Sequence, residues 1–232
     1  MKLSFSLSVM ITSGLCLLPV QAQPLESSAV GAHAPSEHLV DLSRSHWGYA
    51  CTVDMVDKHK VMSGFSDHTF RGDRPMSRYE LGSTLLKAQK ALFRMQGLSL
   101  AFPDTPFPAV LLREAHWARQ DVTELVSTRG LVTDWADDFQ GTAVATREDL
   151  AYALSELMRV YTEHNGSLAS PTGRISALIV DLSPRSSHSA QIQQVLNQEL
   201  MTLYADHTFR PAQPITRYAL AASLCRLFGQ VR

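Results

Sequence analysis

The sequence predicts an all-α protein made of three helix–loop–helix repeats in a pseudo-threefold bundle, and three observations lead to this prediction. Two stretches at 66–81 and 205–220, SDHTFRGDRPMSRYEL and ADHTFRPAQPITRYAL, share nine identical residues. A weaker copy, ADDFQGTAVATREDL, lies between them at 136–150. Apolar residues spaced by four, three and four follow each copy. One such unit of about 50 residues cannot bury its apolar face alone, so we expect three to pack around a common axis.

The composition is typical of a globular protein, with 45% hydrophobic residues and a formal net charge of -1 in 232 residues. No basic stripe is visible, so we expect no nucleic-acid partner. The histidines and cysteines do not show the spacing of a metal site, and the acidic loops lack the dense oxygen ligands of a calcium loop. We therefore expect neither a metal nor another cofactor.

The first 22 residues are typical of a signal peptide, with Lys2, an apolar stretch and small residues at Val20 and Ala22. Residues 23–37 are rich in Pro, Ser and Gly and predict a flexible leader. No later stretch is apolar enough to span a membrane. We expect an exported protein of the periplasm or cell surface, in which Cys51 and Cys225 form one disulfide or remain two buried thiols.

The three repeats are expected at 38–97, 98–166 and 167–232, the second being degenerate. In each, the second helix follows a hydroxyl residue that fits the N-cap position. Ser77 is followed three residues later by Glu80, which predicts a capping box. Asp149 stands at the same place in the second repeat and Ala219 in the third. The hydroxyls are Ser77, Thr146 and Thr216, and the apolar faces are Leu81, Leu85, Ala88, Leu92; Leu150, Leu154, Leu157, Tyr161; and Leu220, Leu224, Leu227, Val231.

A shorter helix is expected before each copy of the loop. Its apolar positions are Trp47, Ala50, Cys51, Met55; Ala118, Val122, Leu125, Val126; and Ile192, Val195, Leu196, Leu200. Two of these helices open with His-Trp, whereas the third opens with His188-Ser189. In the loops, Phe70, Phe139 and Phe209 each stand eight residues before an Arg, and we expect them to anchor the core.

These motifs resemble the S-layer homology domain family over roughly residues 39–229. The resemblance is carried by HWGYA and SGFSDHTFRGDRPMSRYEL, by FPD, HWA and ATREDL, and by YADHTFRPAQPITRYAL. It implies a pseudo-trimer whose grooves hold an anionic cell-wall polysaccharide, often one bearing a pyruvate ketal, or a glycan linked to peptidoglycan. It also implies that Arg78, Arg147 and Arg217 contact this ligand.

The residue chemistry allows this role and also a structural alternative. A guanidinium near the free N–H groups of a helix start can bind a carboxylate in bidentate fashion. Ser77, Thr146 and Thr216 either cap their helices or touch the ligand. Each Arg could instead pair with a structural acid, such as Glu80, Glu148 or an Asp of a neighbouring repeat. Trp47 and Trp117 either stack on sugars or pack into the core.

The sequence therefore favours a non-catalytic cell-envelope module that binds a glycan. The alternative is an envelope protein-interaction or assembly module on the same fold that has lost glycan binding. An enzyme would need a nucleophile–base pair or paired carboxylates, and no such pair recurs. The third copy lacks the Trp and has Leu203 where the first has Gly64, so we expect one or two grooves not to bind.

Overall fold

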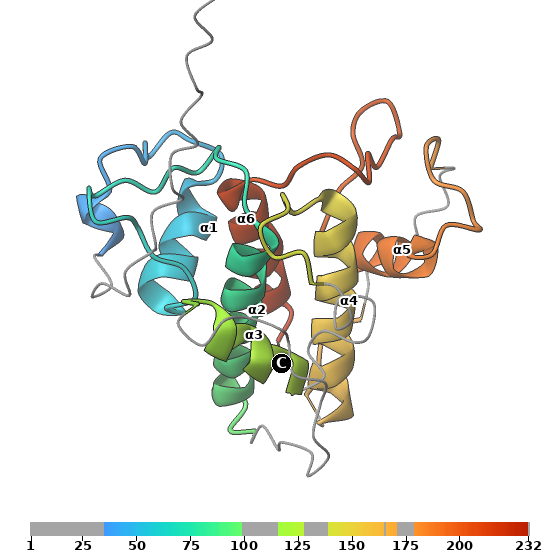
Figure 1. Cartoon of the computed structure of the whole chain (residues 1–232), viewed down its shortest axis with the longest axis horizontal. Coiled ribbons are helices and arrows are strands. Elements are labelled where there is room, and N and C mark those ends of the chain that lie inside the picture. Colours follow the sequence, from blue (N-terminus) through green and yellow to red (C-terminus); the bar gives the residue numbers. More distant parts are fainter. Residues whose placement is uncertain (1–34, 99–115, 128–138, 165, 171–178, 232) are drawn as a thin grey trace, which may run out of the picture.

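The structure is a computed structural model that describes residues 35–98, 116–127, 139–164, 166–170 and 179–231. The regular elements of these ranges are all helices (Figure 1). They are η1 (Ser36–His38), α1 (Tyr49–Val53), the π-helical η2 (Asp54–Lys58), α2 (Arg78–Met95), α3 (Arg119–Ser127), α4 (Arg147–Glu163), α5 (Ser189–Asn197) and α6 (Arg217–Gly229). The all-α prediction is confirmed. The expected signal peptide lies outside the described residues.

The three long helices begin where the sequence predicts. Ser77 and Glu80 form a capping box at α2, and Thr146 and Asp149 form a second one at α4. At α6 the Thr216 hydroxyl accepts a hydrogen bond from the backbone N–H of the third helical residue, Ala219, which has no side chain to complete the box. These local signals fix the starting points of α2, α4 and α6.

Each short helix packs against a long helix other than the one that follows it in the sequence. α3 packs on α2, α5 packs on α4, and α1 with η2 packs on α6. We call these three contacts joints. The α6–α1 joint connects the two ends of the described chain, so the three joints form a closed series.

The segments that precede the long helices are also linked to one another. Isolated antiparallel bridges join Ser77 to Val144, Thr146 to Pro214 and Thr216 to Pro75. Each cap residue is thus paired with the segment just before the cap of the next long helix, and the third bridge returns to the first segment.

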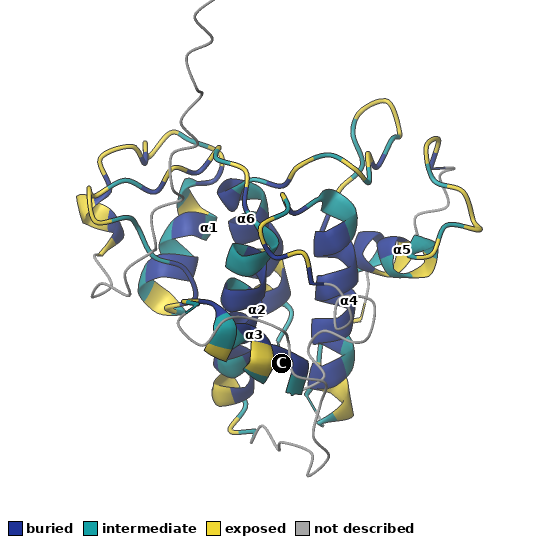
Figure 2. Cartoon of the chain, viewed as in Figure 1, coloured by how far each residue is buried: buried dark blue, intermediate teal, exposed yellow. Residues whose placement is uncertain are grey.

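The core lies between the long helices, whose inward faces are buried (Figure 2). The side chains of Phe70, Phe139 and Phe209 are only 0%, 6% and 0% exposed, which confirms them as core anchors. The prediction for the first short helix was partly wrong, because Trp47 is 65% exposed and Ala50 is also exposed. Because α1 begins only at Tyr49, Trp47 lies before the helix and is not placed by the helical pattern. The buried residues of α1 and η2 are Thr52, Met55 and Val56.

None of the helices in the described ranges is long and apolar enough to cross a membrane. No group of three or more His, Cys, Asp or Glu side chains in these ranges could hold a metal ion.

Candidate ligand-binding site

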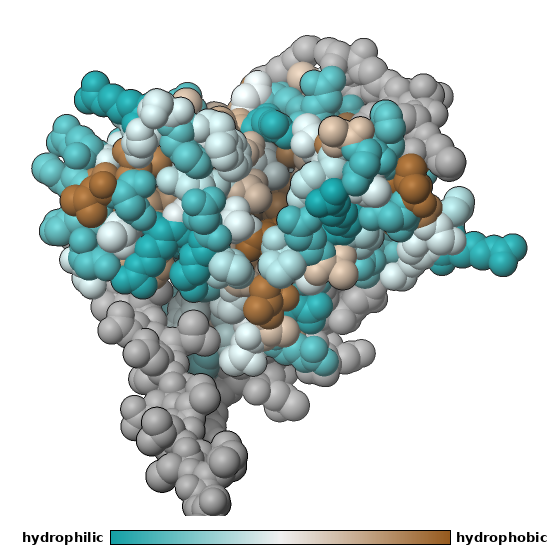
Figure 3. Space-filling view, turned by 90° about the horizontal axis from the view of Figure 1, so that it is seen from above, coloured by the Kyte–Doolittle hydropathy of each residue, from teal (hydrophilic) through white to brown (hydrophobic). Residues whose placement is uncertain are grey.

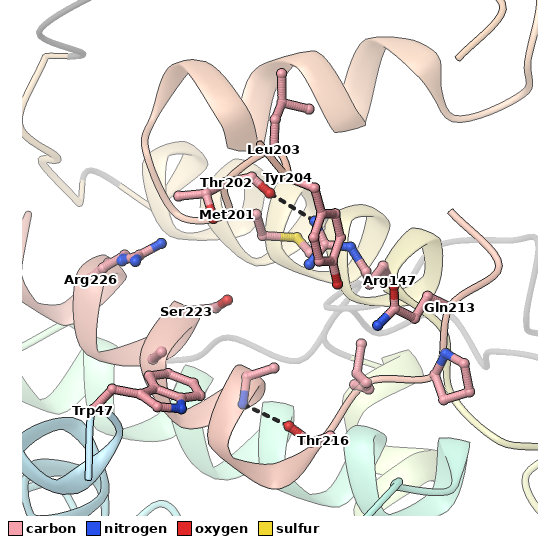
Figure 4. A pocket seen from close by; sticks show the side chains of 14 residues that line it. Trp47, Arg147, Met201, Thr202, Leu203, Tyr204, Gln213, Thr216, Ser223 and Arg226 are labelled. Carbon is pink, nitrogen blue, oxygen red and sulfur yellow. Dashed lines mark hydrogen bonds between the residues drawn. The ribbon is translucent and has the colours of Figure 1, made fainter. Parts of the chain in front are cut away.

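Three residues singled out from the sequence, Trp47, Arg147 and Thr216, line one cavity of about 300 Å³ (Figure 4). Each comes from a different one of the expected repeats. In Figure 4, Trp47 and Arg226 lie on one side of the cavity and Arg147 with Tyr204 on the other. The remaining lining residues are Met201, Thr202, Leu203, Gln213, Pro214, Ile215, Ala219, Ala222 and Ser223. We call this space the Arg147 cavity.

Arg147 is held in place by backbone carbonyls and aromatic rings. Its Nε donates to the carbonyl of Phe209 at 2.7 Å, and one terminal nitrogen donates to the carbonyl of Thr202 at 2.8 Å. The guanidinium also lies 4.9 Å from the ring centre of Tyr204. Burial lowers the pKa of Arg147, while Tyr204 and Asp181 act in the opposite direction. Arg147 therefore remains a cation, but one that has lost part of its hydration.

The charged groups that line the cavity are cationic. Arg147 and Arg226 are its two charged residues, and its described lining contains no Asp or Glu. Asp181 influences Arg147 from outside the lining, but its carboxylate accepts the backbone N–H groups of Phe209 and Arg210, each at 2.7 Å. An anion would therefore meet two guanidinium groups here, beside the hydroxyl side chains of the lining. The face seen from above is mostly hydrophilic, with hydrophobic residues gathered in a few places (Figure 3).

Arg78, the counterpart of Arg147 on α2, has a carboxylate partner within the protein. Its Nε and one terminal nitrogen donate to the two oxygens of Asp149 at 3.2 and 3.0 Å. Asp149 is the third residue of α4 and is only 8% exposed. This is the structural alternative considered for the arginines, namely a pair with an Asp of a neighbouring repeat.

Arg217 resembles Arg147 more closely but lies deeper. It donates to the carbonyls of Phe70 at 2.8 Å and Ser63 at 2.6 Å, and the residue is 8% exposed. Burial, followed by the nearby charge of Arg74, lowers its pKa to about 10. Glu80, the third residue of α2, is paired with Arg74, and its charge raises the Arg217 pKa.

Two sequence differences separate the Arg147 cavity from the surroundings of Arg217. Gln213 occupies the loop position of Arg74, three residues before the cap, and Ala219 occupies the helix position of Glu80, three residues after it. Both members of the Arg74–Glu80 ion pair are thus replaced by uncharged residues that line the cavity. The chain therefore retains the anchored guanidinium but lacks the neighbouring carboxylate.

The cap hydroxyls Ser77, Thr146 and Thr216 all bind backbone N–H groups at 3.2–3.3 Å. The expectation of free N–H groups at the helix starts is wrong, because the first two N–H groups of each long helix also have partners. At α6, Arg217 and Tyr218 donate to the carbonyls of Arg74 and Gly72. The bridges between cap segments bring these carbonyls into place, so an anion must be held by side chains.

The two tryptophans singled out from the sequence lie in different surroundings. Trp47 lines the cavity, and its ring centre is 5.8 Å from that of Tyr218. Trp117 is 40% exposed and lies 6.2 Å from the ring of Tyr79. Neither is a core residue.

The sequence interpretation missed a contact between loop glycines and helix tyrosines that positions these residues. A Cβ atom on Gly72 would lie 2.0 Å from the ring of Tyr218, and one on Gly141 would lie 2.0 Å from the ring of Tyr79. The third place has Pro211 and Glu148 instead, and a carboxylate oxygen of Glu148 lies 3.0 Å from Nδ1 of His188. In the sequence, this contact could have been found from the paired difference at the third place, where Pro replaces Gly and Glu replaces Tyr.

Comparison with known proteins gives one family match. Residues 40–81 match the family model of the S-layer homology domain. No curated protein was found to match the sequence. The match supports a general role in binding at the cell envelope, because domains of this family are non-catalytic modules that associate with the cell wall. It includes Trp47, Arg74, Arg78 and Glu80.

Proposed function

We propose that this protein binds an acidic glycan of the cell envelope in the Arg147 cavity and that it does so without catalysis. The ligand would be a cell-wall polysaccharide, or a glycan attached to peptidoglycan, that carries a carboxylate. The proposal includes a pseudo-threefold bundle of three repeats, which the closed series of joints and cap bridges supports.

The observation that carries the proposal is that the three arginines differ in their acidic neighbours. Arg78 forms an ion pair with Asp149, and Arg217 lies near the Arg74–Glu80 ion pair. Among the described residues, Arg147 has no ion-pair partner. A partly buried cation that has hydrogen-bond acceptors but no anionic partner retains part of its desolvation cost, and a ligand carboxylate would offset that cost. The ligand acid would thus stand where a protein acid stands elsewhere in the fold.

The other lining groups suit a sugar. The exposed indole of Trp47 offers an apolar face on which a pyranose ring can stack. Arg226, Gln213 and Ser223 supply hydrogen-bonding groups around it. The volume of about 300 Å³ is at the lower end of the range for small-molecule sites, which fits a single sugar unit of a longer chain.

The proposed roles of the other predicted residues differ from one another. Trp47, Arg147 and Thr216 would form the ligand site, with Thr216 acting mainly as the helix cap. Arg78 and Arg217 would hold neighbouring repeats together, as would Ser77 and Thr146 through their caps. Trp117 would lie outside the main site.

The test is retention of the full chain on purified peptidoglycan sacculi. Half of the sacculi keep their linked polysaccharide, and the other half are stripped by mild acid. We expect retention only on the unstripped half, and loss of retention in the Arg147→Ala variant. Arg71→Ala is a matched control, because Arg71 is an exposed loop Arg paired with Asp67 and lies outside the cavity lining.

Binding of a carboxylated sugar gives a second, independent readout. Calorimetric titration with glucuronate and with glucose compares two probes that differ by a carboxylate. We expect heat only from glucuronate. Absence of both glucuronate binding and sacculus retention would contradict the proposal and favour the protein-interaction alternative.

A further inference from the structure

The two cysteines of the described chain meet at the joint that closes the series of helices. Cys51 lies on α1 and Cys225 on α6, 174 positions apart in the sequence. Both are half-buried and carry free thiols. The Cys225 thiol interacts with the Cys51 thiol and lies 3.9 Å from the Asp54 carboxylate.

The helix position of Cys225 also makes a contact at the α4–α5 joint. Cys225 and Ser155 both stand nine residues after the cap hydroxyl of their helix. At the α4–α5 joint, Ser155 donates a 2.8 Å hydrogen bond to Gln194. At the α6–α1 joint, the same helix position carries Cys225, whose thiol interacts with that of Cys51.

This joint also forms part of the Arg147 cavity. Trp47 lies four residues before Cys51, while Ser223 and Arg226 flank Cys225 on α6. A covalent bond between the two cysteines would therefore connect the Trp47 side of the cavity to its α6 wall.

We propose that Cys51 and Cys225 form a disulfide that locks α1 onto α6 and fixes Trp47 in the wall of the Arg147 cavity. The disulfide itself is independent of the function proposed above, whereas its effect on ligand binding rests on that function. Because the bond would close a very long loop, it would stabilise the fold mainly by restricting the unfolded chain.

The bond would form by thiol–disulfide exchange with an organic disulfide such as glutathione disulfide. Burial, followed by the contact with Cys51, raises the pKa of the Cys225 thiol to about 12, so Cys225 is a poor first nucleophile. The Cys51 thiolate attacks the glutathione disulfide, forms a mixed disulfide and releases one glutathione thiolate. Cys225 then loses its proton and attacks the Cys51 sulfur, which releases the second. Two protein thiols are oxidised, and one glutathione disulfide is reduced to two thiols.

The test uses the full chain carrying Cys16→Ser, which leaves Cys51 and Cys225 as its two thiols. The protein is exposed to glutathione disulfide, denatured, alkylated with iodoacetamide and weighed. We expect a species 2 Da lighter than the reduced chain, with no alkyl groups attached. Two alkylated thiols, or stable glutathione adducts, would overturn the proposal.

Thermal unfolding then tests what the bond does. We expect the oxidised form to melt roughly 5–10 °C above the reduced form, with no such difference in Cys51→Ser or Cys225→Ser. An oxidised form that melts at or below the temperature of the reduced form would contradict the locking role.

Ligand binding separates this inference from the proposed function. We expect the oxidised form to bind glucuronate several-fold more tightly than the reduced form. Equal, measurable binding by both would refute the coupling to the cavity. If neither form binds, the proposed function and the coupling both fail, while the mass and melting results still decide on the disulfide.

Discussion

Arg78 donates two hydrogen bonds to the carboxylate of Asp149, and this pair shows what the Arg147 cavity lacks. At the next cap bridge, which joins Thr146 to Pro214, the corresponding residues are Arg147 and Ala219. Ala in place of Asp at the third helical residue leaves this position without a carboxylate. In the proposed function, the difference that leaves the α6 capping box incomplete also contributes to the ligand site.

Restoring an acid at position 219 should stabilise the protein. In Ala219→Glu, the new carboxylate can complete the capping box with Thr216 and pair with Arg147. We expect the free energy of unfolding to rise by about 1 kcal/mol, as measured by urea denaturation. Ala219→Gln is the matched uncharged control and should give a smaller increase.

Removing the ion pair near Arg217 should create a second site. The double variant Arg74→Gln, Glu80→Ala gives this position the residues that line the Arg147 cavity. We expect calorimetry with glucuronate to change from one bound ligand per chain to two. A stoichiometry that stays at one in a folded double variant would show that the missing pair alone does not make a site.

The two exposed tryptophans should differ in their effect on binding. Trp47→Ala removes the aromatic wall of the cavity and should weaken glucuronate binding roughly tenfold. Trp117→Ala serves as the control, because Trp117 is also exposed but is absent from the lining. Equal losses in the two variants would argue against stacking in the cavity.

Gly72 should be intolerant of a side chain. A Cβ atom there would lie 2.0 Å from the Tyr218 ring, so Gly72→Ala should lower the free energy of unfolding by about 1–3 kcal/mol. At Gly229 a Cβ atom meets nothing within 4 Å, and Gly229→Ala should change stability by less than about 0.5 kcal/mol. Chemical denaturation of both variants measures the contrast.

Because of the two loops that contain Asp67 and Asp206, the free energy of unfolding should decrease at low pH. Hydrogen bonds from Thr69 and then Arg71 lower the pKa of Asp67 from 3.8 to about 2, and Thr208 with Arg210 lowers that of Asp206 as well. The folded state therefore binds these protons less readily than the unfolded chain. Their stabilising contribution is present above about pH 4 and is lost as the pH falls toward 2.

Urea denaturation across this pH range provides the measurement. The Asp67→Asn, Asp206→Asn variant should be less stable than the parent at pH 5, and the difference should shrink by pH 2.5. A difference that stays constant with pH would contradict this assignment.

The sequence allowed accurate prediction of features that depend on nearby residues. The capping box of Ser77 and Glu80 and the buried Phe70 could be predicted because each follows from a short motif. The exposure of Trp47 could not, because the apolar pattern does not show that the helix begins only at Tyr49, after Trp47.

The candidate site could not be predicted from any one of the loop-and-helix motifs alone. Ala219 was recognisable as a position without an acid, but its significance depends on which arginine lies across the cap bridge. That partner is set by the bridge between Thr146 and Pro214. The meeting of Cys51 and Cys225 likewise follows from closure of the series of joints, which a linear pattern does not determine.

The most direct test of the central claim is retention of Ala219→Glu on sacculi that keep their linked polysaccharide. The account predicts that this variant, although more stable than the parent, is no longer retained, because its own carboxylate occupies Arg147. Ala219→Ser, which adds neither charge nor much volume, should be retained like the parent. Undiminished retention of Ala219→Glu would contradict the claim that a ligand acid takes the place of the missing carboxylate.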